Sequence, residues 1–402
     1  DWSVPEKREG APIPFFSIML WSLVATAISV ALPFIFGLIS PQQSQDLYTG
    51  WALHQNGQMY TDYFGTEGLL YYVLTYLFQG SILIALVEWL ALFGAGVFLF
   101  KAADTLAGQE KEAKRLVFIL YLLVAGLAFG GGYALLLALP FLFYSLSIVT
   151  NYLAFPKDDK GFVRVGMSLA LAFFLAPIPT VLFAAVLALG IIGFNLAKGH
   201  FVHGLYQFFA SALGFSLLFY PLGYYTVWTG SFGDAISQTL YPVNTLSLFS
   251  NSHLLENAAF YGLLAIGLGS LGLLFAGLFQ SKPAKQYALS IATSLGLLIS
   301  LGILILSQEP INGTRLVVLI PFLVLLLLTG IKEDVSEGGS RRRRRREKQT
   351  SFFKGNFYLP LIALAYLIAL PILSRYLSHP ATYQERRSEE HTSELQSPAM
   401  IS

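Results

Sequence analysis

Runs of about 20 apolar residues follow one another almost from end to end of this chain, and an α-helix needs a run of that length to cross the hydrocarbon core of a bilayer. The composition agrees. Of the 402 residues, 55% are hydrophobic and only 12% are charged, whereas soluble domains carry about 25% charged residues. These features argue against a disordered protein, a nucleic-acid binder and an ordinary soluble enzyme. The sequence therefore predicts an all-α, polytopic membrane protein.

Eleven apolar stretches are expected to span the membrane and to form one continuous domain over residues 1–386. They are 14–39, 82–103, 116–130, 134–154, 163–178, 180–196, 204–226, 259–279, 287–306, 316–331 and 357–374. Gly130 to Gly132 and Pro177 to Pro179 are expected to form tight turns between antiparallel helices. The chain has no cysteine, so it can form neither disulfides nor thiolate metal sites.

Lysine and arginine predict the orientation, because cytoplasmic loops carry an excess of both residues. With the N-terminus in the cytoplasm, 21 of the 25 basic residues fall in cytoplasmic segments. These segments are 1–13, 101–116, 155–164, 197–203, 280–286 and 332–356. The two large outside loops, 41–80 and 227–258, contain neither lysine nor arginine. The hexa-arginine run in the loop 332–356 is expected to anchor this topology, with binding of anionic lipid head groups as the alternative.

Residues 387–402 are expected to be a non-native tail. They contain RSEEHTSELQS, a string that resembles a translated DNA-sequencing adapter. The natural chain is then expected to continue differently after Glu385, and these residues are left out of the predicted domain.

The first outside loop holds three carboxylates, Asp46, Asp62 and Glu67, and no basic residue. A carboxylate beside a low-dielectric membrane holds its proton more tightly, which moves its pKa toward the range of a general base. The alternative for Asp46 is helix capping, because a carboxylate near a helix start accepts hydrogen bonds from free N–H groups. The residues alone leave both alternatives open.

Two short helices are predicted in the same loop. Residues 45–54 have helical periodicity, with Leu47, Trp51 and His54 on one face. Residues 67–78 form a second amphiphilic stretch that is rich in tyrosine. Both helices are expected to lie flat on the outer membrane surface, because aromatic residues favour that interface.

This loop follows the pattern D-x-Y-x3-A-x4-G-x2-Y-x-D-Y-x4-G-x-L-x-Y after a long first helix. The matching positions are Asp46, Tyr48, Ala52, Gly57, Tyr60, Asp62, Tyr63, Gly68, Leu70 and Tyr72. The arrangement resembles the GT-C superfamily of integral-membrane glycosyltransferases. The specific match is confined to this loop, and the many-spanning topology extends it loosely over the rest of the chain.

The resemblance implies an enzyme, a hexosyl- or pentosyltransferase. It would move a sugar from a polyprenyl-phosphate carrier to a glycan or lipid acceptor of the cell envelope, on the outer face of the membrane. The sequence shows no organellar signal, so this membrane is expected to be the plasma membrane of a bacterium. Asp46 matches the general base of the family. The substrate-binding residues implied with it are Asp62, Glu67, Tyr48, Tyr60, His54 and Arg315. Arg315 matches a family arginine that contacts the carrier phosphate, for which a guanidinium is well suited; the alternative is snorkelling to the interface.

No cofactor is assigned. Many members of the family have a second acidic residue beside the first aspartate, but here Leu47 follows Asp46. The segment 130–140 also lacks the acidic residue that many members place in the second outside turn. If a divalent metal is used, one expected ligand is missing, and no metal site is assigned.

The second outside loop, 227–258, is predicted to lie over the same outer surface. Its polar and aromatic residues are expected either to shape an acceptor pocket or to be solvated. They are Trp228, Asp234, Gln238, Asn244, His253 and Glu256.

Two other functions remain open. A transporter or flippase of lipid-linked sugars would need a polar path across the bilayer, yet Glu88 is the clearest ionisable residue within the spans. Such a residue is a functional candidate by default, although it can also hydrogen-bond a neighbouring helix. A non-catalytic membrane scaffold of envelope assembly is the third possibility. Membrane lipids are expected partners in all three cases, and nucleic acid is not.

Overall fold

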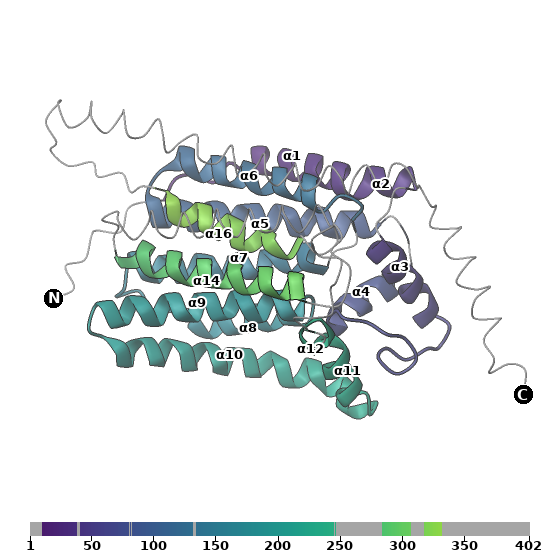
Figure 1. Ribbon diagram of the computed structural model, residues 1–402. Coiled ribbons are helices and arrows are strands. Elements are labelled where there is room, and N and C mark those ends of the chain that lie inside the picture. The colour runs from purple at the N-terminus through teal and green to yellow at the C-terminus, as the bar shows by residue number, and fades with distance from the viewer. Residues whose placement is uncertain are drawn as a thin grey trace, which may run out of the picture.

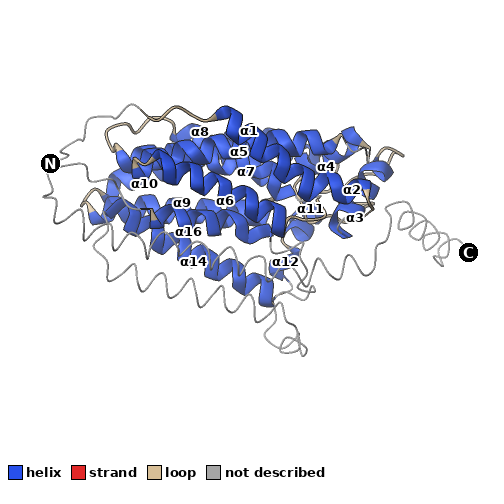
Figure 2. Ribbon diagram, turned by 90° about the horizontal axis from the view of Figure 1, so that it is seen from above, coloured by secondary structure: helices blue, strands red, loops and turns tan. Residues whose placement is uncertain are grey.

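Every regular element in the described part of the chain is a helix (Figures 1 and 2). The computed structural model describes residues 10–37, 41–79, 81, 83–131, 134–244, 246, 284–306 and 317–331. The helices are α1 (Phe15–Thr26), a π-helix (Ala27–Ala31), α2 (Leu32–Ile35), α3 (Pro41–Leu53), α4 (Leu69–Phe78), α5 (Ile84–Ala107), α6 (Glu110–Leu127), α7 (Ala134–Ala154), α8 (Phe162–Phe173), α9 (Pro177–Ala197), α10 (Phe201–Trp228), α11 (Phe232–Thr239), α12 (Tyr241–Asn244), α14 (Ala284–Leu306), a short 3-10 helix (Val317–Leu319) and α16 (Ile320–Gly330). The all-helical prediction is thus confirmed for these residues.

Six helical stretches among the described residues are long and apolar enough to cross a membrane. They are Phe15–Ile35, Ile84–Ala107, Ala134–Ala154, Pro177–Ala197, Phe201–Trp228 and Gln286–Leu306. Three further predicted spans coincide with α6, with α8, and with the short 3-10 helix together with α16. Helix α6 begins with several charged residues, and the other two are shorter than the six stretches above. The predicted spans 259–279 and 357–374, the basic loop 332–356 and the tail 387–402 lie outside the described residues.

The long helices lie side by side as a bundle, and α3, α4, α11 and α12 gather at one end of it (Figure 1). Within the bundle α5 packs on α7, α7 on α8, α8 on α10, and α9 on α14. The largest buried side chains are mostly aromatic, and Tyr152, Phe143, Phe183 and Phe322 are among them. Within a membrane, such interlocking supplies much of the stability, since lipid is as apolar as the side chains.

Of the two turns predicted between helices, one lies where the sequence placed it and the other is displaced. Gly130 and Gly131 have φ values of 100° and 68° between α6 and α7, so the glycine turn is confirmed. The turn predicted at Pro177 to Pro179 is wrong by a few residues, because α8 ends at Phe173 and Pro177 already opens α9. Proline fits the first turn of a helix, where its missing N–H would have no partner.

Two glycines bring α8 and α10 into close contact. A Cβ atom on Gly166 would lie 1.8 Å from the carbonyl oxygen of Ser211, and one on Gly214 would lie 1.9 Å from that of Val163. Neither helix can carry a larger residue there without moving its neighbour's backbone. Small residues commonly permit such close helix packing in membranes.

We expect Gly166→Ala to lower the free energy of unfolding by about 1–3 kcal/mol, the usual cost of overpacking a tight contact. Gly302→Ala is the matched control, because nothing lies within 4 Å of the added Cβ there, one turn before the end of α14. That variant should be neutral or slightly stabilising, since alanine is the better helix former. Thermal unfolding of both variants in detergent measures the difference, and equal melting temperatures would contradict the close α8–α10 contact.

Candidate functional site at one end of the bundle

Helices α3 and α4 run parallel to each other and meet turn by turn. Residues 25 positions apart pair along three successive turns, and a constant offset of this kind requires parallel axes. The pairs are Asp46–Tyr71, Gly50–Thr75 and His54–Gln79. A Cβ atom on Gly50 would lie 2.5 Å from the carbonyl oxygen of Thr75, so the glycine permits this approach. The two helices predicted in the first outside loop are confirmed, at Pro41–Leu53 and Leu69–Phe78.

The turn between α8 and α9 holds the start of α4 in place. The amide of Gly68 donates to the carbonyl of Leu175 (3.1 Å), and the amide of Leu70 donates to that of Phe174 (2.9 Å). A Cβ atom on Gly68 would lie only 2.1 Å from the Phe174 carbonyl oxygen. The glycine of the G-x-L-x-Y motif is therefore required by a backbone contact, and this contact fixes the position of Glu67 next to it.

Asp46, Tyr60, Glu67, Tyr71 and Tyr72 form one group, which we name the outer cluster. The Tyr71 hydroxyl donates to Oδ2 of Asp46 at 2.9 Å, and these residues are 1% and 3% exposed. The Tyr60 hydroxyl donates to the backbone carbonyl of Glu67 (2.7 Å), whose amide donates to the Tyr72 hydroxyl (3.2 Å). The three tyrosines thus tie the two carboxylate-bearing segments together.

Burial and mutual charge raise the pKa values of the outer cluster. The pKa of Glu67 rises from 4.5 to about 8, first because burial disfavours its charged form and second because of the charge of Asp46. Burial also raises the pKa values of Tyr60, Tyr71 and Tyr72, so these hydroxyls stay neutral and can donate hydrogen bonds. At neutral pH Glu67 therefore keeps its proton beside Asp46.

Glu88 approaches the same group from α5. The residue is fully buried, and its charge contributes to the raised pKa of Tyr71 together with those of Asp46 and Glu67. The sequence singles Glu88 out only as an ionisable residue within a span. The structure brings it to the outer cluster, at the start of the helix that follows the first outside loop.

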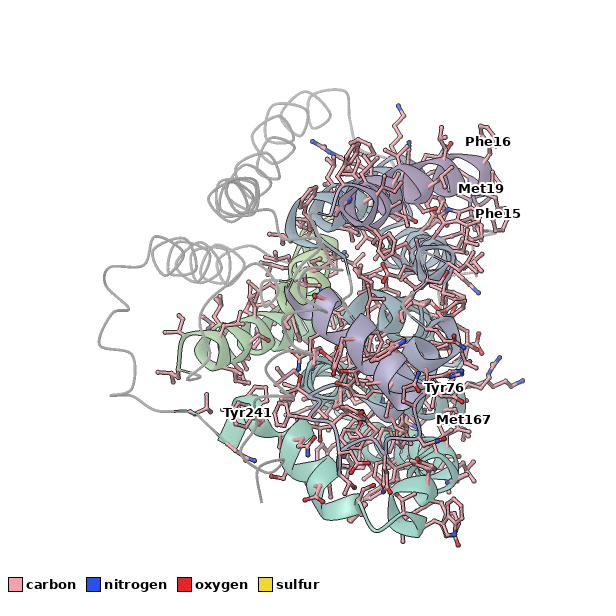
Figure 3. All side chains as sticks on the ribbon, turned by 90° about the vertical axis from the view of Figure 1, so that its right-hand side faces the viewer. Phe15, Phe16, Met19, Tyr76, Met167 and Tyr241 are labelled. Carbon is pink, nitrogen blue, oxygen red and sulfur yellow. The ribbon has the colours of Figure 1, made fainter. Side chains whose placement is uncertain are left out.

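Residues of the segment 227–244 pack against the loop between α3 and α4. The amide group of Gln238 in α11 donates to the Tyr60 carbonyl (2.7 Å) and accepts from the Gly65 amide (3.0 Å). Gln58 donates to the carbonyl of Thr229 (3.1 Å). Figure 3 views this end of the molecule, with Tyr76 of α4 and Tyr241 of α12 labelled. One glutamine therefore joins α11 to the backbone around the outer cluster.

We expect Gln238→Leu to loosen the first outside loop without unfolding the bundle. The change removes both hydrogen bonds, each worth about 1 kcal/mol, and leaves the Gly65 amide and the Tyr60 carbonyl without these bonds. Hydrogen exchange of the amides in residues 56–67 should become faster in this variant than in Asp234→Asn, a control on an exposed residue of α11. Equal exchange in the two variants would show that Gln238 does not hold the loop.

Capping does not account for Asp46. Helix α3 begins at Pro41, so Asp46 lies in its second turn rather than at a cap position. The carboxylate faces Tyr71 of the neighbouring helix instead. Sequence reasoning did not identify Tyr71 as a site residue. Its only signal in the sequence is its position next to Tyr72, which belongs to the motif.

Three predicted substrate-binding residues lie apart from the outer cluster. His54, the residue after α3, is exposed and lies about 12 Å from Asp46 along the helix axis. Its Nε2 is 3.1 Å from Nε2 of Gln79. Asp62 is exposed and accepts a hydrogen bond from the Gln58 amide (2.7 Å), which stabilises a local turn. Tyr48, two residues from Asp46, turns away from it around α3 and packs against Trp51.

Some predicted residues cannot be placed. Arg315, His253 and Glu256 lie outside the described residues. In the described part of the chain, no group of three His, Cys, Asp or Glu side chains has an arrangement that could hold a metal ion. The absence of an assigned metal therefore stays a prediction.

Comparison with known proteins gives a family but no activity. The family model of the competence-induced protein Ccs4 N-terminal domain matches residues 6–379. No curated protein matches the chain, and no solved structure does. Because the family match covers most of the chain and includes every residue of the outer cluster, the chain belongs to the competence-induced Ccs4 N-terminal domain family.

Proposed function

We propose that the chain is a membrane glycosyltransferase of the GT-C type, with Asp46 as its general base. The observation that supports this best is the convergence of Asp46 and Glu67, from separate segments, on Tyr71 at the end of the bundle. Pairs of carboxylates whose surroundings separate their protonation states are typical of acid–base sites. The resemblance of the first outside loop to GT-C enzymes selects sugar transfer among the reactions that such a pair could serve.

In the proposed step, the acceptor hydroxyl attacks the anomeric carbon of the lipid-linked sugar. Asp46 takes the hydroxyl proton, the new oxygen–carbon bond forms, and the bond to the carrier phosphate breaks with inversion. Tyr71 orients the carboxylate of Asp46, while neutral Glu67 adds no second charge beside it at neutral pH. Bringing donor and acceptor together at the membrane surface contributes through proximity.

Access to Asp46 requires the outer loops to separate, because the residue is only 3% exposed. Helix α11 is the natural moving part, since two hydrogen bonds of Gln238 join it to the loop around the outer cluster. An acceptor would enter when α11 moves away, and its return would exclude water from the reaction. Closures of this kind protect reactive sugars from hydrolysis.

The proposed topology has eleven spans with the N-terminus in the cytoplasm, which places the outer cluster at the outer face. The proposed setting is a bacterial plasma membrane, with a polyprenyl-phosphate sugar as donor and a glycan or lipid of the envelope as acceptor. Arg315 is proposed to contact the carrier phosphate. The family description refers to induction during competence, which concerns when a protein is made rather than the reaction it performs.

A transporter is disfavoured by the polar side chains of the spans. Hydroxyl groups of Ser22, Thr26, Ser29 and Thr150 donate to carbonyl groups of their own helices. Their hydroxyl hydrogens are therefore engaged within their own helices. Glu88 joins the outer cluster rather than continuing such a path.

A transfer assay tests the proposal. Membranes containing the chain are mixed with a panel of radiolabelled polyprenyl-phosphate sugars and with envelope acceptors, and labelled glycan or lipid is measured. Transfer that depends on the chain is the expected result. Movement of the lipid-linked sugar across vesicles without any transfer would instead favour a flippase and overturn the assignment.

A further inference from the structure

A groove lies between α8, α9 and α10, away from the outer cluster. Its volume is about 300 Å³, and nearly all of its lining is apolar. Half of the lining residues are glycine, alanine or serine, among them Gly166, Ala184, Ala188 and Ala212. The groove exists because these small side chains face one another where bulkier residues would fill the space.

The groove opens sideways from the bundle. Phe208, at its edge, is 44% exposed, and Ala212 is also exposed. Both residues belong to α10, which is long and apolar enough to span a membrane. The surroundings of this opening would therefore be lipid rather than water, and an empty apolar groove beside lipid tails is readily filled by a hydrocarbon chain.

One end of the three helices carries an excess of positive charge. Lys160 and Arg164 lie at the start of α8, and Lys198 directly follows α9. All three side chains are exposed. Two carboxylates lie in the same region: Asp158 accepts a hydrogen bond from Asn151, and Asp159 lies 3.9 Å from the imidazole of His203. With Lys157 the cations still outnumber these carboxylates, so the region keeps a positive charge.

The groove begins close to these cations. Val165, which lines it, directly follows Arg164. Ile191, the lining residue of α9 nearest this end, lies about 9 Å along the helix from Ala197. The cations thus lie at the end of the helices, and the apolar groove lies deeper in the bundle. A phospholipid has the same arrangement, with its phosphate at the membrane surface and its acyl chain deeper.

We propose that this groove binds one anionic phospholipid, with its phosphate at Arg164 and Lys198 and part of one acyl chain between α9 and α10. Charge complementarity selects an anionic lipid over a zwitterionic one. The lipid would come from the cytoplasmic leaflet, given the proposed orientation of the chain. The site does not depend on the proposed sugar transfer, because it lies toward the other end of the same helices from the outer cluster.

The site can be tested by native mass spectrometry of the purified full chain, which measures lipid binding. The two probes are palmitoyl-oleoyl phosphatidylglycerol, which is anionic, and palmitoyl-oleoyl phosphatidylcholine, which is zwitterionic. The parent chain should bind phosphatidylglycerol more tightly. Each cation near a membrane surface contributes about fivefold, so Arg164→Gln with Lys198→Gln should weaken phosphatidylglycerol binding about 30-fold and leave phosphatidylcholine unchanged. Lys101→Gln, which alters an exposed lysine on α5, is the matched control and should change neither affinity.

Ala188→Phe tests the groove itself, since the ring would occupy the space of the acyl chain and weaken binding of both lipids. The double glutamine variant changes only exposed side chains, so it decides the question even if the Ala188 variant does not fold. Equal binding of the two lipids by the parent chain, or an unchanged phosphatidylglycerol affinity in the double variant, would overturn the proposal. None of these measurements requires sugar transfer, so failure here leaves the proposed function standing.

Discussion

Asp46→Asn is expected to lower sugar transfer by about 10²- to 10⁴-fold, the usual contribution of a general base. Asparagine has nearly the same shape as aspartate, and its carbonyl oxygen can still accept the hydrogen bond from Tyr71 that stands at 2.9 Å in the parent chain. The variant should therefore insert and fold normally. The loss is expected in turnover at saturating donor, because the binding surfaces for both substrates remain.

Asp62→Asn is the control for this experiment. It removes a carboxylate from the same outside loop, but Asp62 is exposed and serves a local turn. Transfer by this variant should stay within a few-fold of the parent. Full turnover by Asp46→Asn, with a melting temperature equal to that of the parent, would remove Asp46 from the role of base. A similar loss in both variants would point to the shape of the loop rather than to proton transfer.

The sequence predicts the local structure of this site well. Apolar periodicity and the Asn56-Gly57 turn signal locate both helices of the first outside loop to within a few residues, and Asn56 has the left-handed φ of 73° that such a turn needs. These signals act over a few neighbouring residues. They are therefore visible in the chain without knowledge of its path.

The contacts that create the outer cluster could not be predicted in the same way. The Asp46–Tyr71 pair depends on the offset between two parallel helices, and the path of the loop between them sets that offset. Gln238 meets Tyr60 across 178 positions of the chain. The need for Gly68 arises from a carbonyl of the α8–α9 turn, which nothing near Gly68 in the sequence reveals.

The free energy of unfolding of the parent chain is expected to fall as pH rises. Glu67→Gln should abolish this fall. The pKa of Glu67 is about 4.5 in the unfolded chain and about 8 in the folded one, so between these values the folded state holds a proton that the unfolded state has lost. Stability is therefore full below pH 4.5, declines as pH rises toward 8 and is constant above it. Because part of the residue reaches solvent, we expect a decline of about 2 kcal/mol rather than the full linkage value.

Glutamine resembles protonated glutamate in size and has no charge to lose, so the variant should unfold at nearly the same temperature at pH 5 and pH 9. The parent should melt at a lower temperature at pH 9 than at pH 5, by several degrees more than the variant. Glu110→Gln is the control, since Glu110 is partly exposed and forms an ion pair with Lys114 on the surface of α6. It should leave the pH dependence of the parent intact.

The effect of the Asp46 charge on the pKa of Glu67 can be measured separately from the effect of burial. Asp46→Asn removes the charge that disfavours ionised Glu67 but leaves the burial of Glu67 unchanged. In that background the folded-state pKa of Glu67 should move down, and the decline in stability should end at a lower pH than in the parent. An unchanged end point would mean that Asp46 and Glu67 do not sense each other, and the outer cluster would then lack the charge coupling on which its proposed acid–base role depends.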